Sequence, residues 1–345
     1  MTYRNILIVK LSAIGDVIHA LPVASALKKC FSQARITWIV EPPAYDLLTN
    51  NPYIDEIIVF EKAKFKSLSG FYQYAPAFIK TLRAKQFDLA LDLQGLFKSA
   101  AISLLSGAPR RFVYCNAREG SDKVGKRICG PNSQGHVVER YFDVVRELGC
   151  NITNPEFVIN ITDEEAAVAA AIAKQAGLTL ESPYIVLMPG TNWPNKCWPA
   201  DKFAQLADQL FASNLIPVLV GGNAEKNVIS EIAAQTAILP IDISGRTTLK
   251  QLAHIIKNAR AVVAGDTGPM HLAAALGTPV IALFGPTDPN RNGPYGLGHH
   301  VVTIQRDCQG CWQRQCPEGK DCLSDIDVKI VYEALKTVIV RRETS

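Results

Sequence analysis

The sequence has no apolar run as long as the roughly 18 residues that a membrane-spanning helix needs. Its longest apolar stretches, residues 7–14 and 280–284, are interrupted by Lys10 and ended by Gly285. Gly (23) and Pro (20) are near their average frequencies and no heptad persists, which excludes collagen, a coiled coil and a disordered chain. Because Lys10 and Asp16 lie within the first apolar stretch, no secretory signal is indicated. We expect a cytoplasmic protein of two compact domains.

Several ligand-binding signatures are also missing. No finger, homeodomain or RNP-type pattern is present, so nucleic acid is not an expected partner. The dinucleotide fingerprint G-x-G-x-x-G is absent, which argues against a nicotinamide cofactor. No Asp-x-Asp pair lies at a strand end of the first half, and the pair Asp325 and Asp327 begins the last predicted helix, where it suits a cap. We therefore expect chemistry that requires no cofactor.

Charge is unevenly distributed along the 345 residues. Residues 1–155 carry 20 Lys and Arg against 13 Asp and Glu, a net charge of +7, whereas residues 156–345 carry 16 against 19, a net charge of −3. A basic first half favours a phosphorylated or carboxylated ligand or an anionic membrane surface, and a solvated basic face is the alternative. Lysines and aromatic residues are concentrated between Lys62 and Lys85, a segment suited to anionic lipid headgroups.

Strand-like apolar segments alternate with helical segments twice along the chain, which is typical of parallel βαβ units. A helix predicted at 17–30 starts late or bends at Pro22. The pattern predicts the α/β class, with two Rossmann-like domains facing across a cleft and ligands at the carboxyl ends of the strands. The predicted parts are residues 1–155, residues 156–325 and a C-terminal helix over residues 326–345 that packs back toward the first domain. The predicted strands are 5–10, 35–40, 56–60, 87–93, 111–114, 184–188, 216–220, 261–264 and 280–284.

The nine cysteines fall into two groups. Those scattered along the chain are predicted to be reduced core or loop thiols: Cys30, Cys115, Cys129, Cys150 and Cys197. The others fall within 15 residues with the spacing C-x2-C-x4-C-x5-C: Cys308, Cys311, Cys316 and Cys322. This spacing resembles a structural metal knuckle, with disulfides or buried thiols as the alternatives.

Three loops after predicted strands carry candidate site residues. Gly15 allows a tight turn after the first strand, and Asp16 at the mouth of that strand is either a helix cap or a general base. In the loop at 265–271, Pro269 suits the first helical position, so the free N–H groups of the first turn predict a diphosphate site. The alternative there is a capped structural helix with a packed histidine.

The third loop, residues 188–199, offers hydrogen bonds from Thr191 and Asn192 at a strand mouth. Lys196 in the same loop would offset the charge of a leaving diphosphate, and a solvated loop lysine is the alternative. Glu225 follows another strand, in a position to accept hydrogen bonds from ribose hydroxyls.

Four separated motifs, at residues 11–22, 196–199, 265–271 and 284–289, resemble glycosyltransferase family nine, the heptosyltransferases with the GT-B fold. Residues 92–100 and 116–119 make the sequence most similar to heptosyltransferase I, which adds the first heptose to Kdo of lipid A. The resemblance implies an inverting enzyme that moves heptose from ADP-heptose to Kdo of the lipopolysaccharide inner core.

The resemblance also implies residue roles and partners. Asp16 would deprotonate the acceptor hydroxyl, and Lys98 and Arg118 would bind the acidic acceptor. The expected partners are ADP-heptose, a Kdo-lipid A type acceptor and, transiently, the anionic cytoplasmic face of the inner membrane. The residues expected to hold the donor are Thr191, Asn192, Lys196, Glu225, Asp266, Thr267, Gly268 and His271.

Three other interpretations remain open on the sequence. One is a family-nine enzyme that uses a different acceptor or nucleotide sugar. Another is a sugar-nucleotide 2-epimerase, which shares the fold. The third is a non-catalytic phospho-ligand or metal-binding module built around Cys308–Cys322.

Overall fold

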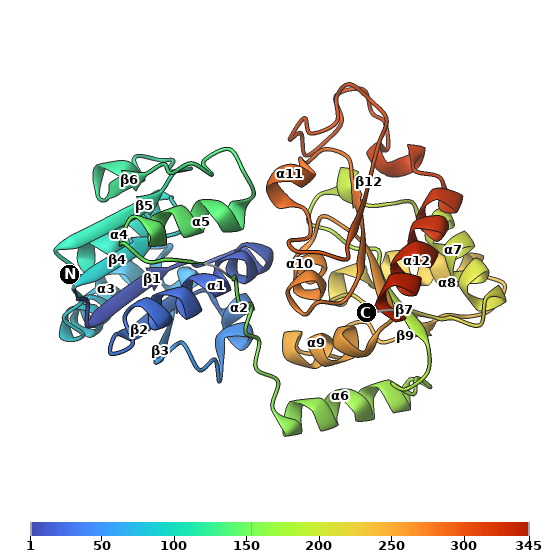
Figure 1. The fold of residues 1–345 in the computed structure, drawn as a ribbon, viewed down its shortest axis with the longest axis horizontal. Helices are drawn as coiled ribbons and strands as arrows, with labels where there is room; N and C mark the ends of the chain where they lie inside the picture. Colours follow the sequence, from blue (N-terminus) through green and yellow to red (C-terminus); the bar gives the residue numbers. More distant parts are fainter. Residues whose placement is uncertain (1, 153, 344–345) are drawn as a thin grey trace. The chain divides into compact units, whose positions relative to one another are not determined.

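The structure, a computed structural model, describes residues 2–152 and 154–343. Its contacts divide the chain into two compact units, Met1–Asn160 and Ile161–Ser345. Each unit contains a six-stranded sheet flanked by helices, and the hydrogen-bonded strand pairs are parallel (Figure 1). The predicted α/β class is therefore confirmed.

The sheet of the first unit has the strand order β3-β2-β1-β4-β5-β6. Its central strand β1 pairs with β2 on one side and β4 on the other, so the chain reverses its direction of winding beside β1. Loops that follow β1 and β4 therefore leave the same edge of the sheet next to each other. The strands are β1 (Asn5–Val9), β2 (Arg35–Val40), β3 (Glu56–Val59), β4 (Leu89–Asp92), β5 (Arg110–Tyr114) and β6 (Lys126–Ile128). The helices are α1 (Ile14–Cys30), α2 (Pro42–Tyr45), α3 (Leu68–Ala84), α4 (Phe97–Leu105) and α5 (Val137–Arg146).

Helices cover both faces of this sheet because successive side chains of a strand point to opposite faces. Ile6 and Ile8 of β1 belong to one buried cluster, with side chains of α1 and α5. Leu7 and Val9 belong to a second buried cluster, which includes Leu82 of α3 and Ile102 of α4. All four β1 side chains are fully buried, which explains why this segment is continuously apolar rather than alternating.

Helix α1 corrects one of the two alternatives predicted for this segment, a start delayed to Pro22. It begins at Ile14 and contains Pro22 in its interior. A proline inside a helix costs about 3 kcal/mol because it removes one hydrogen bond and crowds the preceding turn. Burial of most of α1, with Val17, Leu21 and Leu27 in the core, outweighs that cost.

The second unit repeats the plan with the strand order β12-β11-β10-β7-β8-β9. Its first strand, β7, is again central, between β10 and β8. The strands are β7 (Tyr184–Met188), β8 (Ile216–Leu219), β9 (Ile241–Asp242), β10 (Ala261–Gly265), β11 (Val280–Phe284) and β12 (His300–Thr303). The helices are α6 (Asp163–Gln175), α7 (Ala200–Ala212), α8 (Lys226–Gln235), α9 (Leu249–Asn258), α10 (Gly268–Ala275), α11 (Pro289–Asn292) and α12 (Val328–Glu343).

Within the second unit, Ile185 and Leu187 of β7 pack in one cluster with side chains of α7, α8 and α12. Helix α12, the last helix, contacts α7 and strands β10, β11 and β12. None of the helices within residues 2–152 and 154–343 combines the length and the apolar character needed to cross a bilayer. The sequence pattern did not predict the strands β6, β9 and β12. Strands β6 and β9 have three and two residues, too few to establish a periodicity, and β12 has only one buried residue.

Four of the scattered cysteines are not reduced thiols, contrary to the prediction. Cys30 and Cys150 form a disulfide with their Cα atoms 5.6 Å apart, and Cys115 and Cys129 form a second one with a Cα distance of 4.6 Å. Cys30 ends α1, and Cys150 lies just beyond α5, which contacts α1. Their sequence separation of 120 positions hides this proximity. Cys197 is a free thiol, as predicted.

Candidate active site

Asp16 lies at the start of α1, immediately after the loop that follows β1. It is the third residue of the helix, and its Oδ2 accepts a hydrogen bond from the N–H of Ala13, the N-cap residue, at 3.2 Å. An acidic side chain in the first helical turn is stabilised by the helix dipole. Its side chain nevertheless remains 43% exposed. The carboxylate therefore has a capping role and is still accessible to a ligand.

A buried ammonium group lies beneath Asp16. Lys10 is only 2% exposed, and its Nζ donates a hydrogen bond to the carbonyl of Leu93 at 3.1 Å. The same Nζ is 3.9 Å from Asp16 Oδ1 and 5.2 Å from the ring centroid of Tyr141. The buried ammonium group and the carboxylate carry opposite charges and attract each other. The sequence showed Lys10 only as a break in an apolar run.

Two polar residues at the end of β4 hold the Asp16 loop in place. Gln94 Oε1 accepts the N–H groups of Leu11 and Ser12 at 3.0 and 3.1 Å. Asp92 in turn accepts the N–H of Gln94 and the hydroxyl of Ser99, at 2.9 Å each. Burial raises the pKa of Asp92, and these hydrogen bonds oppose that effect. Neither residue was predicted to contribute to the site, although polar residues after a buried strand are a signal for one.

The two predicted acceptor-binding residues follow the neighbouring strands β4 and β5. Lys98 is in the first turn of α4 and forms an ion pair with Glu41 Oε1 at 2.5 Å. The N–H of Arg118 donates to the carbonyl of Gly95 at 2.8 Å, which joins the loop after β5 to the loop after β4. Gly95 has a φ of +68°, and a Cβ there would lie 2.8 Å from the Tyr114 ring, so only glycine fits.

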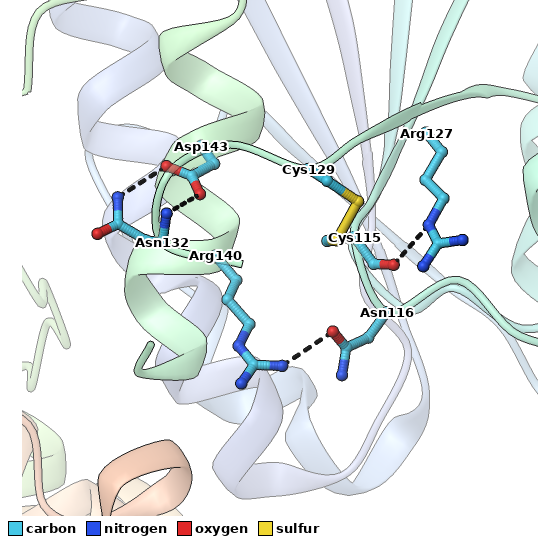
Figure 2. The surroundings of a disulfide bond; sticks show 7 residues. All are labelled: Cys115, Asn116, Arg127, Cys129, Asn132, Arg140 and Asp143. Carbon is cyan, nitrogen blue, oxygen red and sulfur yellow. Dashed lines mark hydrogen bonds between the residues drawn. A yellow bond between two sulfur atoms is a disulfide. The ribbon is translucent and has the colours of Figure 1, made fainter. Parts of the chain in front are cut away.

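Further contacts hold the residues that precede Arg118 in its loop. Figure 2 shows Asn116 beside the disulfide of Cys115 and Cys129, with Arg140 Nη1 donating to Asn116 Oδ1 at 2.9 Å. Arg127 Nε donates to the carbonyl of Cys115 at 2.7 Å. The segment that precedes Arg118 is thereby held at the end of β5.

In the second unit, Asp266 is the centre of a buried polar cluster at the end of β10. Its Oδ2 accepts from Lys196 Nζ at 2.6 Å and from Thr287 Oγ1 at 2.8 Å, and its Oδ1 is 3.4 Å from His271 Nε2. Burial would raise the pKa of Asp266, but the His271 hydrogen bond and charge, together with the Lys196 ammonium, hold it well below its usual range. The structure thus brings three of the predicted donor-binding residues together.

The start of α10 adjoins this cluster. Thr267 is the N-cap, its side chain makes no capping hydrogen bond, and Gly268 and Pro269 are the first two helical residues. The first-turn N–H groups and the dipole of such a helix favour an anion. A Cβ on Gly265 would lie 2.5 Å from the carbonyl of Lys196, so glycine is required for the Lys196 loop to approach β10.

The other predicted donor-binding residues surround the ends of β7 and β8. Thr191 Oγ1 donates to the carbonyl of Trp193 at 2.7 Å, which shapes the loop that carries Lys196, and Asn192 is exposed. Glu225 Oε2 accepts the N–H of Gly222 at 2.7 Å. A Cβ on Gly190 would lie 2.0 Å from Glu225 Cγ, so Glu225 lies directly against the end of β7.

The cysteine cluster does not assemble a metal site. Within the described part of the chain, no group of three or more His, Cys, Asp or Glu side chains is placed to hold a metal ion. The four thiols are free: Cys308 and Cys311 are exposed, Cys316 is half-buried and Cys322 is buried. Burial raises the pKa of Cys322 to about 11, which keeps its thiol protonated at neutral pH. These residues therefore do not fit the predicted metal knuckle, and no chemical step is assigned to a metal.

The sequence of the chain matches a known family over most of its length. The sequence model of glycosyltransferase family 9 (heptosyltransferase) matches residues 76–321. The chain belongs to glycosyltransferase family 9. It is therefore a glycosyltransferase with the GT-B type of fold, as the sequence motifs predicted.

Its relatives include enzymes of lipopolysaccharide assembly. The chain is 26% identical over 347 residues to lipopolysaccharide core heptosyltransferase OpsX of Haemophilus influenzae, covering 96% of each protein. It is 30% identical over 325 residues to lipopolysaccharide heptosyltransferase 1 of Pseudomonas aeruginosa, covering 90% of this chain and 87% of the relative. The structure of E. coli heptosyltransferase WaaC with ADP is similar, with a TM-score of 0.76, 25% identity and coverage of 97% of this chain and 99% of WaaC.

Proposed function

We propose that this family 9 glycosyltransferase moves heptose from ADP-heptose to Kdo of the lipopolysaccharide inner core, with inversion at the anomeric carbon, as heptosyltransferase I does. The printed functions of the relatives support the class of reaction, and the ADP bound to WaaC supports the nucleotide. Heptosyltransferases 1, 2 and 3 match at 30%, 26% and 28% identity, so similarity alone does not choose the acceptor. The choice of Kdo rests on the motifs at residues 92–100 and 116–119.

The observation that carries this proposal is the accessible carboxylate of Asp16, oriented by Ala13 and backed by the buried Lys10. In the proposed reaction, Asp16 accepts the proton of the acceptor hydroxyl as its oxygen bonds to the anomeric carbon of heptose. The bond between that carbon and the diphosphate breaks, and ADP leaves with the electron pair. A positioned base of this kind contributes a rate factor of about 10²–10⁴.

We assign the leaving diphosphate to the second unit. Lys196 and the first turn of α10 supply positive charge where negative charge develops on ADP. Thr267, Gly268 and His271 lie at the start of that helix, and the carboxylate of Asp266 contacts both Lys196 and His271. Thr191, Asn192 and Glu225 at the ends of β7 and β8 complete the donor set. The proposal requires no cofactor.

We assign the acidic acceptor to Lys98, in the first turn of α4, and to Arg118, whose N–H donates to Gly95 in the loop just before α4. We also propose that the enzyme rests transiently on the anionic cytoplasmic face of the inner membrane, where a lipid-linked acceptor is held. The segment from residue 62 to residue 85 contains six Lys and Arg and no acidic residue. Such a segment is attracted to anionic headgroups.

The decisive experiment is incubation of the enzyme with ADP-heptose and Kdo-lipid A, with mass spectrometry of the lipid. We expect the lipid to gain one heptose residue. Asp16→Asn should still bind ADP but lose turnover by about 10²–10⁴-fold, because the amide cannot accept the proton.

Asp122→Asn is the matched control, because Asp122 is an exposed acid of the same unit. It should retain full turnover. A wild-type enzyme that leaves the lipid unchanged would overturn the assigned donor and acceptor, and thermal shift with other nucleotide sugars would then identify the nucleotide. A fully active Asp16→Asn would remove Asp16 from the mechanism.

A further inference from the structure

The cysteine-rich loop, residues 304–321, lies against the proposed donor site rather than apart from it. The N–H of Gly310 donates to the carbonyl of Gly285 at 2.9 Å, and the N–H of Trp312 donates to the carbonyl of Pro286 at 2.7 Å. Both acceptors lie in the turn after β11. That turn also contains Thr287, whose hydroxyl donates to Asp266. The cysteine-rich loop is therefore joined to the Asp266 cluster through one turn.

A second connection joins the cysteine-rich loop to the loop that carries Lys196. The Asn195 side-chain amide donates to the carbonyl of Gln313, and Asn195 is buried. Lys196 follows Asn195, and Arg314 follows Gln313. This hydrogen bond therefore brings the backbones of the two cationic residues near each other.

Lys196 and Arg314 share one aromatic partner. The Nζ of Lys196 is 4.2 Å from the ring centroid of Trp193, and the guanidinium carbon of Arg314 is 5.4 Å from the same centroid. The Nζ of Lys196 and the guanidinium carbon of Arg314 are therefore separated by no more than the sum of those two distances. A cation–π contact with an indole ring attracts the guanidinium group without using its N–H donors.

The two cations differ in how their charge is balanced. Lys196 is paired with Asp266 at 2.6 Å, whereas Arg314 forms no ion pair with any carboxylate in residues 2–152 and 154–343. Arg314 is also exposed. The positive charge and the N–H donors of Arg314 are thus available to an anionic ligand. The positive charge of Lys196, in contrast, is already offset by Asp266.

We propose that Arg314 binds the diphosphate of the nucleotide donor as a second cation beside Lys196. This inference rests on the proposed assignment of the donor to the second unit. The guanidinium group matches two phosphate oxygens at once, and Lys196 offers a single point charge. The cysteine-rich loop is then a part of the donor site, and its cysteines occupy the segment that delivers Arg314.

Calorimetric binding of ADP and of adenosine to the full-length enzyme tests this proposal. Arg314→Ala should weaken ADP binding about tenfold or more, since a charge-assisted hydrogen bond is lost, and should leave adenosine binding unchanged. Arg314→Lys should restore part of the ADP affinity, because it keeps the charge without the two-point geometry. The melting temperature of each variant should equal that of the wild type.

Lys320→Ala is the matched control, because Lys320 is an exposed cation of the same loop that pairs with Glu318 at 2.5 Å. It should bind ADP like the wild type. Unchanged ADP binding by Arg314→Ala overturns the proposal, as does an equal loss of ADP and adenosine binding, which indicates a damaged loop.

Lys196→Ala separates this inference from the proposed function. If Lys196→Ala weakens ADP binding and Arg314→Ala does not, the donor site stands and only the role of Arg314 is wrong. If neither variant affects ADP binding, the donor is wrongly assigned to this site and both proposals fail.

Discussion

At the scale of single residues, buried charges contact the residues that we propose as the site of each unit. Lys10, only 2% exposed, lies 3.9 Å from Asp16, and Asp266, only 7% exposed, holds both Lys196 and His271. A charge is tolerated in the interior only where a partner or hydrogen bonds compensate its loss of water. Each buried group therefore has few alternative positions, and the groups that it contacts are held with it.

The Asp266 cluster predicts a pH dependence of stability. Burial alone would raise the pKa of Asp266, but His271 and Lys196 together hold it below its ordinary value of 3.8. A carboxylate with a lowered pKa stabilises the folded state above that ordinary value, and the contribution is lost as the pH falls below it. Asp266→Asn should lower the free energy of unfolding by about 3 kcal/mol at pH 7, because Lys196 loses its buried partner.

Urea unfolding at pH 7, 5 and 3 measures this contribution. The difference between wild type and Asp266→Asn should be constant between pH 7 and pH 5 and should shrink at pH 3. Asp307→Asn, which changes an exposed acid of the same unit, should match the wild type at every pH. A difference that does not depend on pH would show that the charge of Asp266 is not what stabilises the cluster.

At the scale of the element, α3 has an apolar face that is only half covered. Ala75 and Leu82 are buried on this face, whereas Leu68 and Phe71, at helical spacing before them, are 81% and 47% exposed. Tyr72 beside them is 77% exposed. Residues three, four and seven apart share one side of a helix, so the apolar face continues beyond the part that packs on the unit. The exposed end lies within the basic segment, residues 62–85, that we assign to the membrane.

This face predicts salt-sensitive binding to vesicles that contain anionic phospholipid. The double variant Leu68→Ser and Phe71→Ser should lower the bound fraction several-fold in a co-sedimentation assay, since two apolar side chains no longer enter the headgroup region. Its melting temperature should not change, because both side chains are exposed.

Leu297→Ser, at a position that is 97% exposed in the second unit, is the control and should bind vesicles like the wild type. Absence of salt-sensitive binding by the wild type would overturn the membrane assignment. Equal binding by the double variant would place the contact on another surface.

At the scale of the whole molecule, the chain forms two parallel sheets of the same plan, and the proposed site residues lie at the carboxyl ends of the strands in each. Asp16 follows β1, and Asp266 follows β10, at the carboxyl ends of central strands in their own sheets. The first unit also contains both disulfides, and the five free cysteines comprise Cys197 and the four of the cluster, all in the second unit. The two units therefore differ in covalent cross-linking although they share a plan.

The cysteine pairing predicts a thiol count. Denatured, unreduced enzyme should react with a maleimide mass tag at five cysteines and, after reduction, at all nine. Cys30→Ser should raise the unreduced count to six, because Cys150 loses its partner, and Cys197→Ser should lower it to four. Nine tags without reduction would contradict both disulfides.

The local sequence pattern predicted those strands, turns and helix starts that depend only on residues close together in the chain. Continuous apolar segments predicted β1, β7, β10 and β11, since a strand buried on both faces needs apolar residues throughout. Gly265 and Pro269 marked the turn and the start of α10 because few other residues satisfy the backbone there. Pro22 misled the same reasoning, since its local penalty was outweighed by burial of the whole of α1.

By itself, the sequence determined the α/β plan, the loops after the strands and the family, because these follow from periodicity, glycine and proline positions and contiguous motifs. Only the tertiary structure decided which distant residues meet: Cys30 with Cys150, Gln94 with the loop before Asp16, and Arg314 with the loop of Lys196. These contacts depend on strand order and helix packing, and residues far apart in the chain carry no local sign of them.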